Sequence, residues 1–406
     1  MRRTKLGFRR RDGEERKKVV IVMEKLPQEL IIDILSRLPT LSLLQSTRVC
    51  RSWHQIITTD PIFTTLRYNR SPISTDALFL TNSKRLYFNQ LIKPHSSPNI
   101  DLSSFLHGIN TERFDLKVIG VCNGLICFAT FPKVIPRARG RTNNFYRVNS
   151  FHIINPISKE KLQLPKFPKS LKIGSTSKIE SMIYEFGFDK RNQVFKLVFF
   201  VFGLNENVKK LLLFTLEGVA SRWRSVSGNV VPCMMRYAFS NASSIYVDGC
   251  LHWITRNTMP NSTDRTLVIM SFNLSDEAFG VIQTPELVVV DHHSVHELAV
   301  LDNSLCWVDS ESNNHINIWI KKGDESWTRS FCLQKSIVAP PSFGPVTPIK
   351  FEQNGRLFLK NRKCVACYDV QDNTATFFDV NYGDPQRDSY PDVFPFVGSF
   401  ISINSH

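Results

Sequence analysis

The hydrophobic positions divide the chain into a short helical part and a long part built from strands. Between residues 26 and 66 the apolar side chains follow helical spacing, and Pro27 and Pro39 stand where a first helix would begin and end. A second, shorter helix follows, and a third spans about residues 48–58. We therefore expect three short helices, followed by a single turn that opens at Asp60-Pro61.

A different pattern fills the chain from residue 116 onward. Short apolar strands meet at turns of the Asn-Gly or Asp-Gly type, which supply the positive φ angles that two-residue hairpins need. A second pair of strands follows each hairpin. The hairpin turns lie near residues 124, 191, 249, 303 and 355, so the unit repeats about every 52 to 67 residues.

This period, with four strands in each unit, is typical of β-propeller blades. Five units are visible, and we expect the strands at 76–88 to combine with residues 394–403 into a sixth that closes the ring. Closure would pair edge strands that are otherwise exposed. The predicted fold class is α+β multidomain: a small three-helix N-terminal domain followed by an all-β propeller of about six blades. A pair of β-sandwiches is the alternative.

The helical part resembles an F-box. The matching residues are the Leu-Pro-x-Glu-Leu run at 26–30, the Ile-Leu-x-Arg-Leu-Pro run at 34–39, the leucines at 43 and 44, and the Val-Cys-Arg-x-Trp run at 49–53. The resemblance implies binding to a Skp-type adaptor, which connects an F-box protein to the cullin and RING subunits of a ubiquitin ligase. The residues that it assigns to adaptor binding are Leu26, Pro27, Leu30, Ile31, Ile34, Leu35, Leu38, Pro39, Leu43, Leu44, Val49, Cys50 and Trp53.

The strand-rich part resembles the F-box-associated domain of plant F-box proteins, which is kelch-like. The matching residues are the Cys-Asn-Gly-Leu run at 122–125, Asn155-Pro156 and the Gly-Phe-Asp run at 187–189. Both resemblances together imply a substrate-receptor subunit of an SCF-type cullin–RING ubiquitin ligase. Such a subunit recruits a protein target for ubiquitination and has no catalytic residue or cofactor of its own. The target itself cannot be named from the sequence.

The expected organisation has four parts. A basic, disordered tail covers residues 1–22, the F-box covers 23–67, a linker with the first strands covers 68–115, and the propeller-like domain covers 116–406. Three helices of this length expose more apolar surface than they can bury among themselves, because about forty residues rarely form an independent core. This surplus independently favours docking of the helical part on a partner.

The net charge of +15 suggests a second hypothesis, that of a nucleic-acid or polyanion-binding protein. Residues 1–22 hold nine basic and three acidic side chains, so +6 of the charge is local to the tail. The loop at 132–149 contributes Arg137, Arg139 and Arg141, which are the candidate residues for contacting an acidic protein target. Because much of the charge is confined to the tail, nucleic acid is the less favoured partner.

The nine cysteines are an odd number scattered through a long chain, which favours reduced thiols in the nucleus or the cytoplasm. The sequence contains no run of eighteen apolar residues, so we expect no membrane-spanning helix.

Little in the sequence indicates metal or catalytic chemistry, and we expect no metal site. Cys364 and Cys367 are three apart in a predicted strand, where their side chains point to opposite faces. His292, His293 and His296 lack the spacing of a metalloprotease motif. The tryptophans recur at blade positions, where packing between sheets is expected; a carbohydrate-binding platform, our third hypothesis, would need them at an exposed end of the ring.

Overall fold

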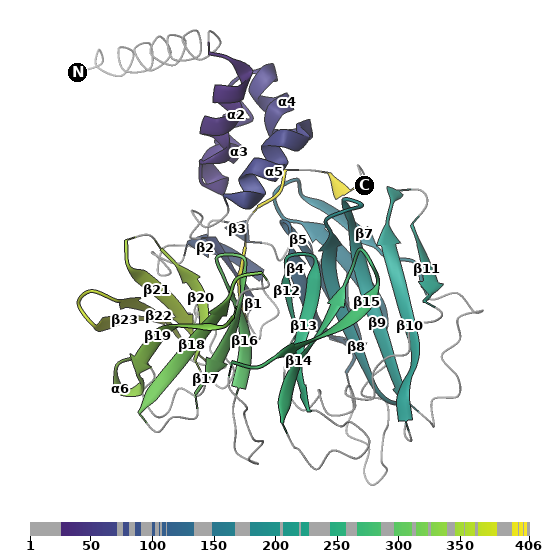
Figure 1. The fold of residues 1–406 in the computed structure, drawn as a ribbon. Coiled ribbons are helices and arrows are strands. Elements are labelled where there is room, and N and C mark those ends of the chain that lie inside the picture. The colour runs from purple at the N-terminus through teal and green to yellow at the C-terminus, as the bar shows by residue number, and fades with distance from the viewer. Residues whose placement is uncertain are drawn as a thin grey trace.

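Figure 1 shows the computed structural model, in which a group of helices lies against one end of a larger all-β domain. The structure describes residues 26–403 with gaps at 71–75, 81–85, 91–99, 102–104, 106–107, 111, 134–147, 167–178, 204–205, 219–220, 227–243, 257–265, 286–295, 311–313, 324–325, 339–345, 353, 362–363, 380–391, 397 and 401. The predicted tail at residues 1–22 therefore lies outside the described residues.

The helical part contains four described helices where the sequence predicted three. They are α2 (Gln28–Ser36), α3 (Thr40–Ser46), α4 (Arg51–Thr59) and α5 (Pro61–Asn69). Pro27 precedes α2 as expected; Pro39, which was expected to end the first helix, follows the end of α2 at Ser36 by three residues and directly precedes α3. A proline just before or within the first turn of a helix sacrifices no helical hydrogen bond.

The prediction of a single turn after Asp60 was wrong, because α5 is a complete helix of nine residues. The Asp60 carboxylate accepts hydrogen bonds from the backbone N–H groups of Ile62 and Phe63, at 2.8 and 3.0 Å, and so caps the new helix. Phe63 is buried, and Arg67 on the next turn donates to the carbonyl of Leu38 at 2.7 Å. These tertiary contacts stabilise a helix whose sequence alone has weak helical character.

The β domain consists of four-stranded antiparallel sheets, as the repeat predicted. Five of these sheets are each built from one continuous stretch of the chain. In chain order their strands are β4 (Phe114–Cys122), β5 (Leu125–Pro132), β6 (Ser150–Asn155) and β7 (Glu160–Gln163); β8 (Ile179–Asp189), β9 (Val194–Gly203), β10 (Glu206–Leu216) and β11 (Arg222–Ser225); β12 (Ile245–Val247), β13 (Cys250–Arg256), β14 (Leu267–Asn273) and β15 (Ala278–Gln283); β16 (His296–Leu301), β17 (Ser304–Asp309), β18 (His315–Lys321) and β19 (Thr328–Gln334); and β20 (Thr347–Phe351), β21 (Arg356–Lys360), β22 (Cys364–Asp369) and β23 (Thr374–Asp379). A short helix, α6 (Lys335–Val338), follows β19.

The remaining four-stranded sheet is not built from one continuous stretch of the chain, so five blades follow the repeat rather than the predicted six or so. It joins the C-terminal strand β24 (Asp392–Pro395) to β1 (Asp76–Leu80), β2 (Leu86–Gln90) and β3 (Ile100–Asp101). Strand β24 pairs antiparallel with β1, so the two ends of the β domain meet in one sheet. The described residues at 396, 398–400 and 402–403, which we expected to belong to a strand, lie outside this sheet, and Phe400 packs into the core of the helices. The arrangement is a propeller, and the alternative of two β-sandwiches is wrong.

The predicted hairpin turns are confirmed by backbone geometry. Asn123 and Gly124 have φ angles of 49° and 73°, and Asp248 and Gly249 have 49° and 84°, so both residues of each turn adopt the left-handed conformation. This matches the twist of antiparallel strands, and asparagine, aspartate and glycine adopt it most readily. Asn155, Asp189, Asn273 and Asp369 each accept backbone hydrogen bonds two and three residues further on, which closes turns elsewhere in the sheets.

Large aromatic side chains fill the space between neighbouring sheets. Trp223, Trp253 and Trp307 are buried, as expected for packing residues. The rings of Tyr184 and Phe199 stack with centroids 4.6 Å apart. None of the described helices is long and apolar enough to span a membrane.

Candidate interaction surfaces

Helix α2 presents one apolar row to solvent and another to the core. Leu30 and Ile34 lie one turn apart, with 50% and 38% of their surfaces exposed. Ile31, Ile32 and Leu35 lie on the opposite side and are buried. Because burial of exposed leucine and isoleucine side chains against a partner is energetically favourable, the row of Leu30 and Ile34 is a candidate docking surface.

The thirteen residues predicted to bind the adaptor separate into three groups by burial. Five are exposed: Pro27, Leu30, Ile34, Pro39 and Val49. Four are partly buried: Leu26, Leu38, Leu44 and Cys50. The remaining four are core residues of this chain: Ile31, Leu35, Leu43 and Trp53. A buried side chain cannot contact a partner directly, so the core group is corrected to a supporting role.

Two features of this surface were missed by sequence reasoning. Ile62 on α5 is 62% exposed. Conversely, Ile157 and Phe400 of the β domain pack into the helical core, so part of the surplus apolar surface is covered within the chain itself. The amphipathic pattern of α5 was a readable signal for the first feature, but no local signal indicated the second.

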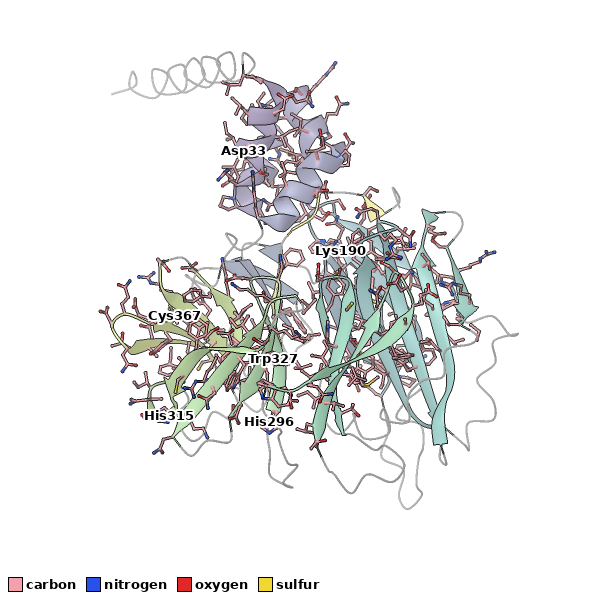
Figure 2. All side chains as sticks on the ribbon, in the orientation of Figure 1. Asp33, Lys190, His296, His315, Trp327 and Cys367 are labelled. Carbon is pink, nitrogen blue, oxygen red and sulfur yellow. The ribbon has the colours of Figure 1, made fainter. Side chains whose placement is uncertain are left out.

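The polar side of the helical part is held by charged hydrogen bonds around Asp33, which Figure 2 labels on α2. Its carboxylate lies 3.0 Å from Arg37 Nε on the same helix and 2.6 Å from Arg70 Nη2 just after α5. Hydrogen bonds from these two arginines lower the pKa of Asp33. Arg70 also donates to Ser36 Oγ at 2.6 Å, so α5 is tied to α2 on this side.

The β domain has two unlike ends. The turn at Asn123-Gly124 and the turn at 156–159 lie toward the helices, since Ser399 touches Gly124 and Ile157 touches the helical core. Because strands in a sheet alternate in direction, the segment between β5 and β6 leaves the sheet at the opposite end. Figure 2 places Lys190, in the turn after β8, near the helices, and His296, at the start of β16, at the far end.

This far end is where the long connections of the sheets depart. They include the loop at 132–149, which was predicted to contact the target, together with the segments that follow β7, β11 and β15. The candidate target-binding residues Arg137, Arg139 and Arg141 lie outside the described residues. The flanking backbone is described: Lys133 N–H donates to the carbonyl of Arg113 at 2.9 Å, and Asn149 N–H donates to that of Thr130 at 2.8 Å.

Polar side chains occupy corresponding positions on the first strands of several sheets. Ser244 donates a short hydrogen bond to the Glu185 carboxylate, and Thr347 donates one to Glu297, so each bond joins neighbouring sheets. Burial raises the pKa of Glu185 to about 7, although the Ser244 hydroxyl and the charge of Lys117 oppose this shift. Because these polar groups bond to one another, they join the sheets rather than form an open site.

The structure also describes several of the cysteine, histidine and tryptophan side chains considered as candidate metal or carbohydrate sites. Cys364 is buried on β22 and contacts the side chain of Asn361, while Cys367 is partly exposed on the same strand. The His296 ring stacks on Trp307 with centroids 4.9 Å apart; His292 and His293 lie outside the described residues. Within the described ranges, no group of three or more histidine, cysteine, aspartate or glutamate side chains is placed to hold a metal ion. The buried tryptophans are not placed as a carbohydrate platform.

Comparison with known families matches both parts of the chain. The model described as an F-box associated beta propeller domain matches residues 77–399, and the model described as F-box-like matches residues 23–68. The chain belongs to the family of proteins with an F-box associated β-propeller domain. Helices α2–α5 are accordingly its F-box, and the sheets are its F-box-associated propeller.

The chain is also similar, at low identity, to F-box proteins of Arabidopsis thaliana. F-box protein At3g07870 is 26% identical over 77% of this chain and 73% of its own length. Putative F-box protein At3g52320 is 23% identical over 69% of this chain and 65% of its own length. Among solved structures, an α-L-arabinanase of Penicillium chrysogenum is 10% identical, covers 66% of this chain and 81% of its own, and has a TM-score of 0.39. A likeness this remote supports no inference about activity.

Proposed function

We propose that this protein is a substrate-receptor subunit of an SCF-type cullin–RING ubiquitin ligase. The F-box binds a Skp-type adaptor, which connects it to the cullin and RING subunits. The propeller binds a protein target. The receptor is non-catalytic, because it acts by holding target lysines near the ubiquitin-charged enzyme. Free thiols at the eight described cysteines support a nuclear or cytoplasmic location.

The observation that carries the proposal is the exposed apolar row on α2. Leu30 and Ile34 remain uncovered on α2, and Val49 is exposed between α3 and α4, whereas Ile31, Ile32 and Leu35 of α2 are packed in the core. The match to the F-box model over residues 23–68 supports a Skp-type adaptor as the occupant. We assign direct contact to Leu30, Ile34 and Val49 with the flanking Pro27 and Pro39, and a supporting role to the buried residues beneath them.

The target is proposed to bind at the far end of the propeller, away from the F-box. The long connections depart there, and loops at the end of a rigid scaffold are the usual place for recognition. This arrangement leaves the adaptor and the target on separate surfaces. We also propose that the propeller is kelch-like and that β24 with β1–β3 serves as its sixth blade.

Affinity purification followed by mass spectrometry tests the assignment. The experiment compares the intact chain with the Leu30→Ala/Ile34→Ala variant and with a Val281→Ala/Val370→Ala control, which removes exposed apolar side chains from the propeller. We expect adaptor and cullin to disappear only from the Leu30→Ala/Ile34→Ala sample, while other partners persist in all three. Adaptor recovery that is equal in all samples would contradict the proposal. Point variants are preferable to deletion of the F-box, because deletion would uncover Ile157 and Phe400.

A further inference from the structure

The last described residues of the chain connect the F-box to the propeller. We propose that the described residues between 396 and 403 (396, 398–400, 402 and 403), here called the C-terminal strap, fix the F-box in one orientation on the propeller. The functional consequence, a fixed separation between the adaptor and the bound target, rests on the proposed function. The mechanical part of the inference rests on the contacts of the strap alone.

The strap inserts three apolar side chains into three different cores. Phe396 is 2% exposed and packs with Ile126 and Phe128 of the sheet β4–β7. Phe400 is 8% exposed and lies in the F-box core with Leu35 and Trp53. Ile403 is again buried in the propeller, in the core that contains Phe151 and Trp223. The strap therefore passes from the propeller into the F-box and back within eight residues.

Two glycine positions show how closely the strap fits. A Cβ atom added to Gly398 would lie 2.4 Å from Thr40 Cγ2 of α3 and 2.9 Å from Ile157 Cγ1 of the propeller. A Cβ atom added to Gly124 would lie 2.2 Å from the backbone nitrogen of Ser399. These separations are shorter than any real carbon contact, so F-box, strap and propeller leave no space between them at this point.

Polar contacts hold the end of the strap. Glu160, at the start of β7, accepts hydrogen bonds from the Ser402 hydroxyl and from the backbone N–H of Ile403, the latter at 2.7 Å. Burial opposes ionisation of Glu160, but these bonds and one from Ser158 bring its pKa below the usual value. Glu160 therefore accepts these bonds as a carboxylate, which makes them stronger than bonds between neutral groups.

The other end of the strap is fixed by β24, which directly precedes the strap in the chain and pairs with β1. The same C-terminal segment thus pairs with the first strand of the propeller and then binds the F-box. With both ends held and Phe400 buried between them, rotation of the F-box requires Phe400 to leave its core. Transfer of a buried phenylalanine to water alone disfavours the rotated state by roughly 10- to 100-fold, so the population of a rotated F-box is small.

The test measures the F-box–propeller distance directly in the full chain. Spin labels carried by genetically encoded ketone amino acids replace Gln55 on α4 and Asp372 after β22, which are both exposed; this labelling avoids the native cysteines. Pulsed electron–electron resonance then gives the distance distribution. We expect one narrow distribution for the parent chain and a broad one for Gly398→Ala. Gly398→Ala/Thr40→Ser should be partly narrowed, since serine lacks the Cγ2 atom that lies closest to the new methyl group, while the contact with Ile157 remains.

Gly323→Ala is the matched control, because a Cβ atom at Gly323 has no neighbour within 4 Å. Its distribution is expected to equal that of the parent. If Gly398→Ala unfolds the chain, Glu160→Gln replaces it, since this change keeps every apolar contact and weakens the hydrogen bonds from Ser402 and Ile403 together with the local one from Ser158. A distribution that is broad in the parent, or that stays narrow in the folded strap variant, would overturn the inference. Neither outcome depends on adaptor binding, so the proposed function is tested separately.

Discussion

The ammonium group of Lys196 lies 2.8 Å from the carboxylate of Asp189, and both side chains are almost fully buried. Lys196 also lies 3.0 Å from Glu277 and donates to the carbonyl of Leu274 at 2.6 Å, so it joins the sheet β8–β11 to the sheet β12–β15. Burial opposes the ionisation of Asp189, but hydrogen bonds from Lys196, Ser275 and Asn192 bring its pKa well below the usual range. The pair holds two blades together at the end nearest the F-box.

Lys196→Met should lower the free energy of unfolding by roughly 3–5 kcal/mol, because it leaves the buried Asp189 carboxylate without its cation. Thermal unfolding of the full chain measures the effect. Lys190→Ala is the control: Lys190 pairs with Asp248, but both side chains are at least half exposed and such a pair contributes little. Equal losses in the two variants would show that burial does not strengthen the Lys196 contacts.

Acid should remove this stabilisation. Asp189 has a lowered pKa in the folded chain, so its contribution is fully present above the ordinary aspartate pKa of 3.8 and is lost as the pH falls through the lower folded value. The stability of the parent should therefore decline more steeply than that of Lys196→Met below about pH 4. Denaturant titrations at several pH values make the comparison, and parallel curves would count against it.

Glu185 should give the opposite pH dependence. Its pKa is raised to about 7 by burial, against an ordinary value of 4.5, so between these values the folded chain keeps a proton that the unfolded chain releases. The free energy of unfolding should consequently fall as the pH rises through that window and level off above it. Glu185→Gln should flatten this slope and be more stable than the parent at pH 8. A slope that is unchanged in the variant would assign the effect to another group.

A comparison of Leu35→Ala with Leu30→Ala distinguishes residues that stabilise the F-box from residues that dock on the partner. Because this side chain is completely buried, Leu35→Ala should destabilise the F-box by about 2–5 kcal/mol through lost packing and the cavity that remains. Hydrogen exchange at the amides of α2–α5 measures the loss. Leu30→Ala, at an exposed position of the same helix, should leave the exchange rates nearly unchanged. Similar acceleration in both variants would mean that the two rows of α2 do not differ as described.

The features predictable from the sequence were those encoded locally. The turns at Asn123-Gly124 and Asp248-Gly249 can be recognised from their residue types, because few residues adopt positive φ angles. The repeat of these turns predicts four-stranded units. The beginning of α2 follows from Pro27 in the same way. Local chemistry was sufficient for these elements because their hydrogen bonds close within a few residues.

The features that were not predictable depend on contacts between distant parts of the chain. The Glu160–Ile403 hydrogen bond spans 243 residues, and Phe400 enters the F-box core from the far end of the sequence. Which row of α2 is buried is decided by such partners, so periodicity identified the apolar positions of α2 but not that Leu35 is among the buried ones. The length of α5 likewise depends on Phe63, Arg67 and Arg70 meeting the other helices.

The most direct test of the account is the affinity of the full chain for a purified Skp-type adaptor, measured by isothermal titration calorimetry. Truncating two apolar contact residues should cost about 2 kcal/mol or more, so Leu30→Ala/Ile34→Ala should weaken binding by roughly 30-fold or more. The Val281→Ala/Val370→Ala control should bind like the parent. An unchanged dissociation constant for Leu30→Ala/Ile34→Ala, with the F-box still folded, would contradict the assignment of the exposed row on α2 to adaptor docking.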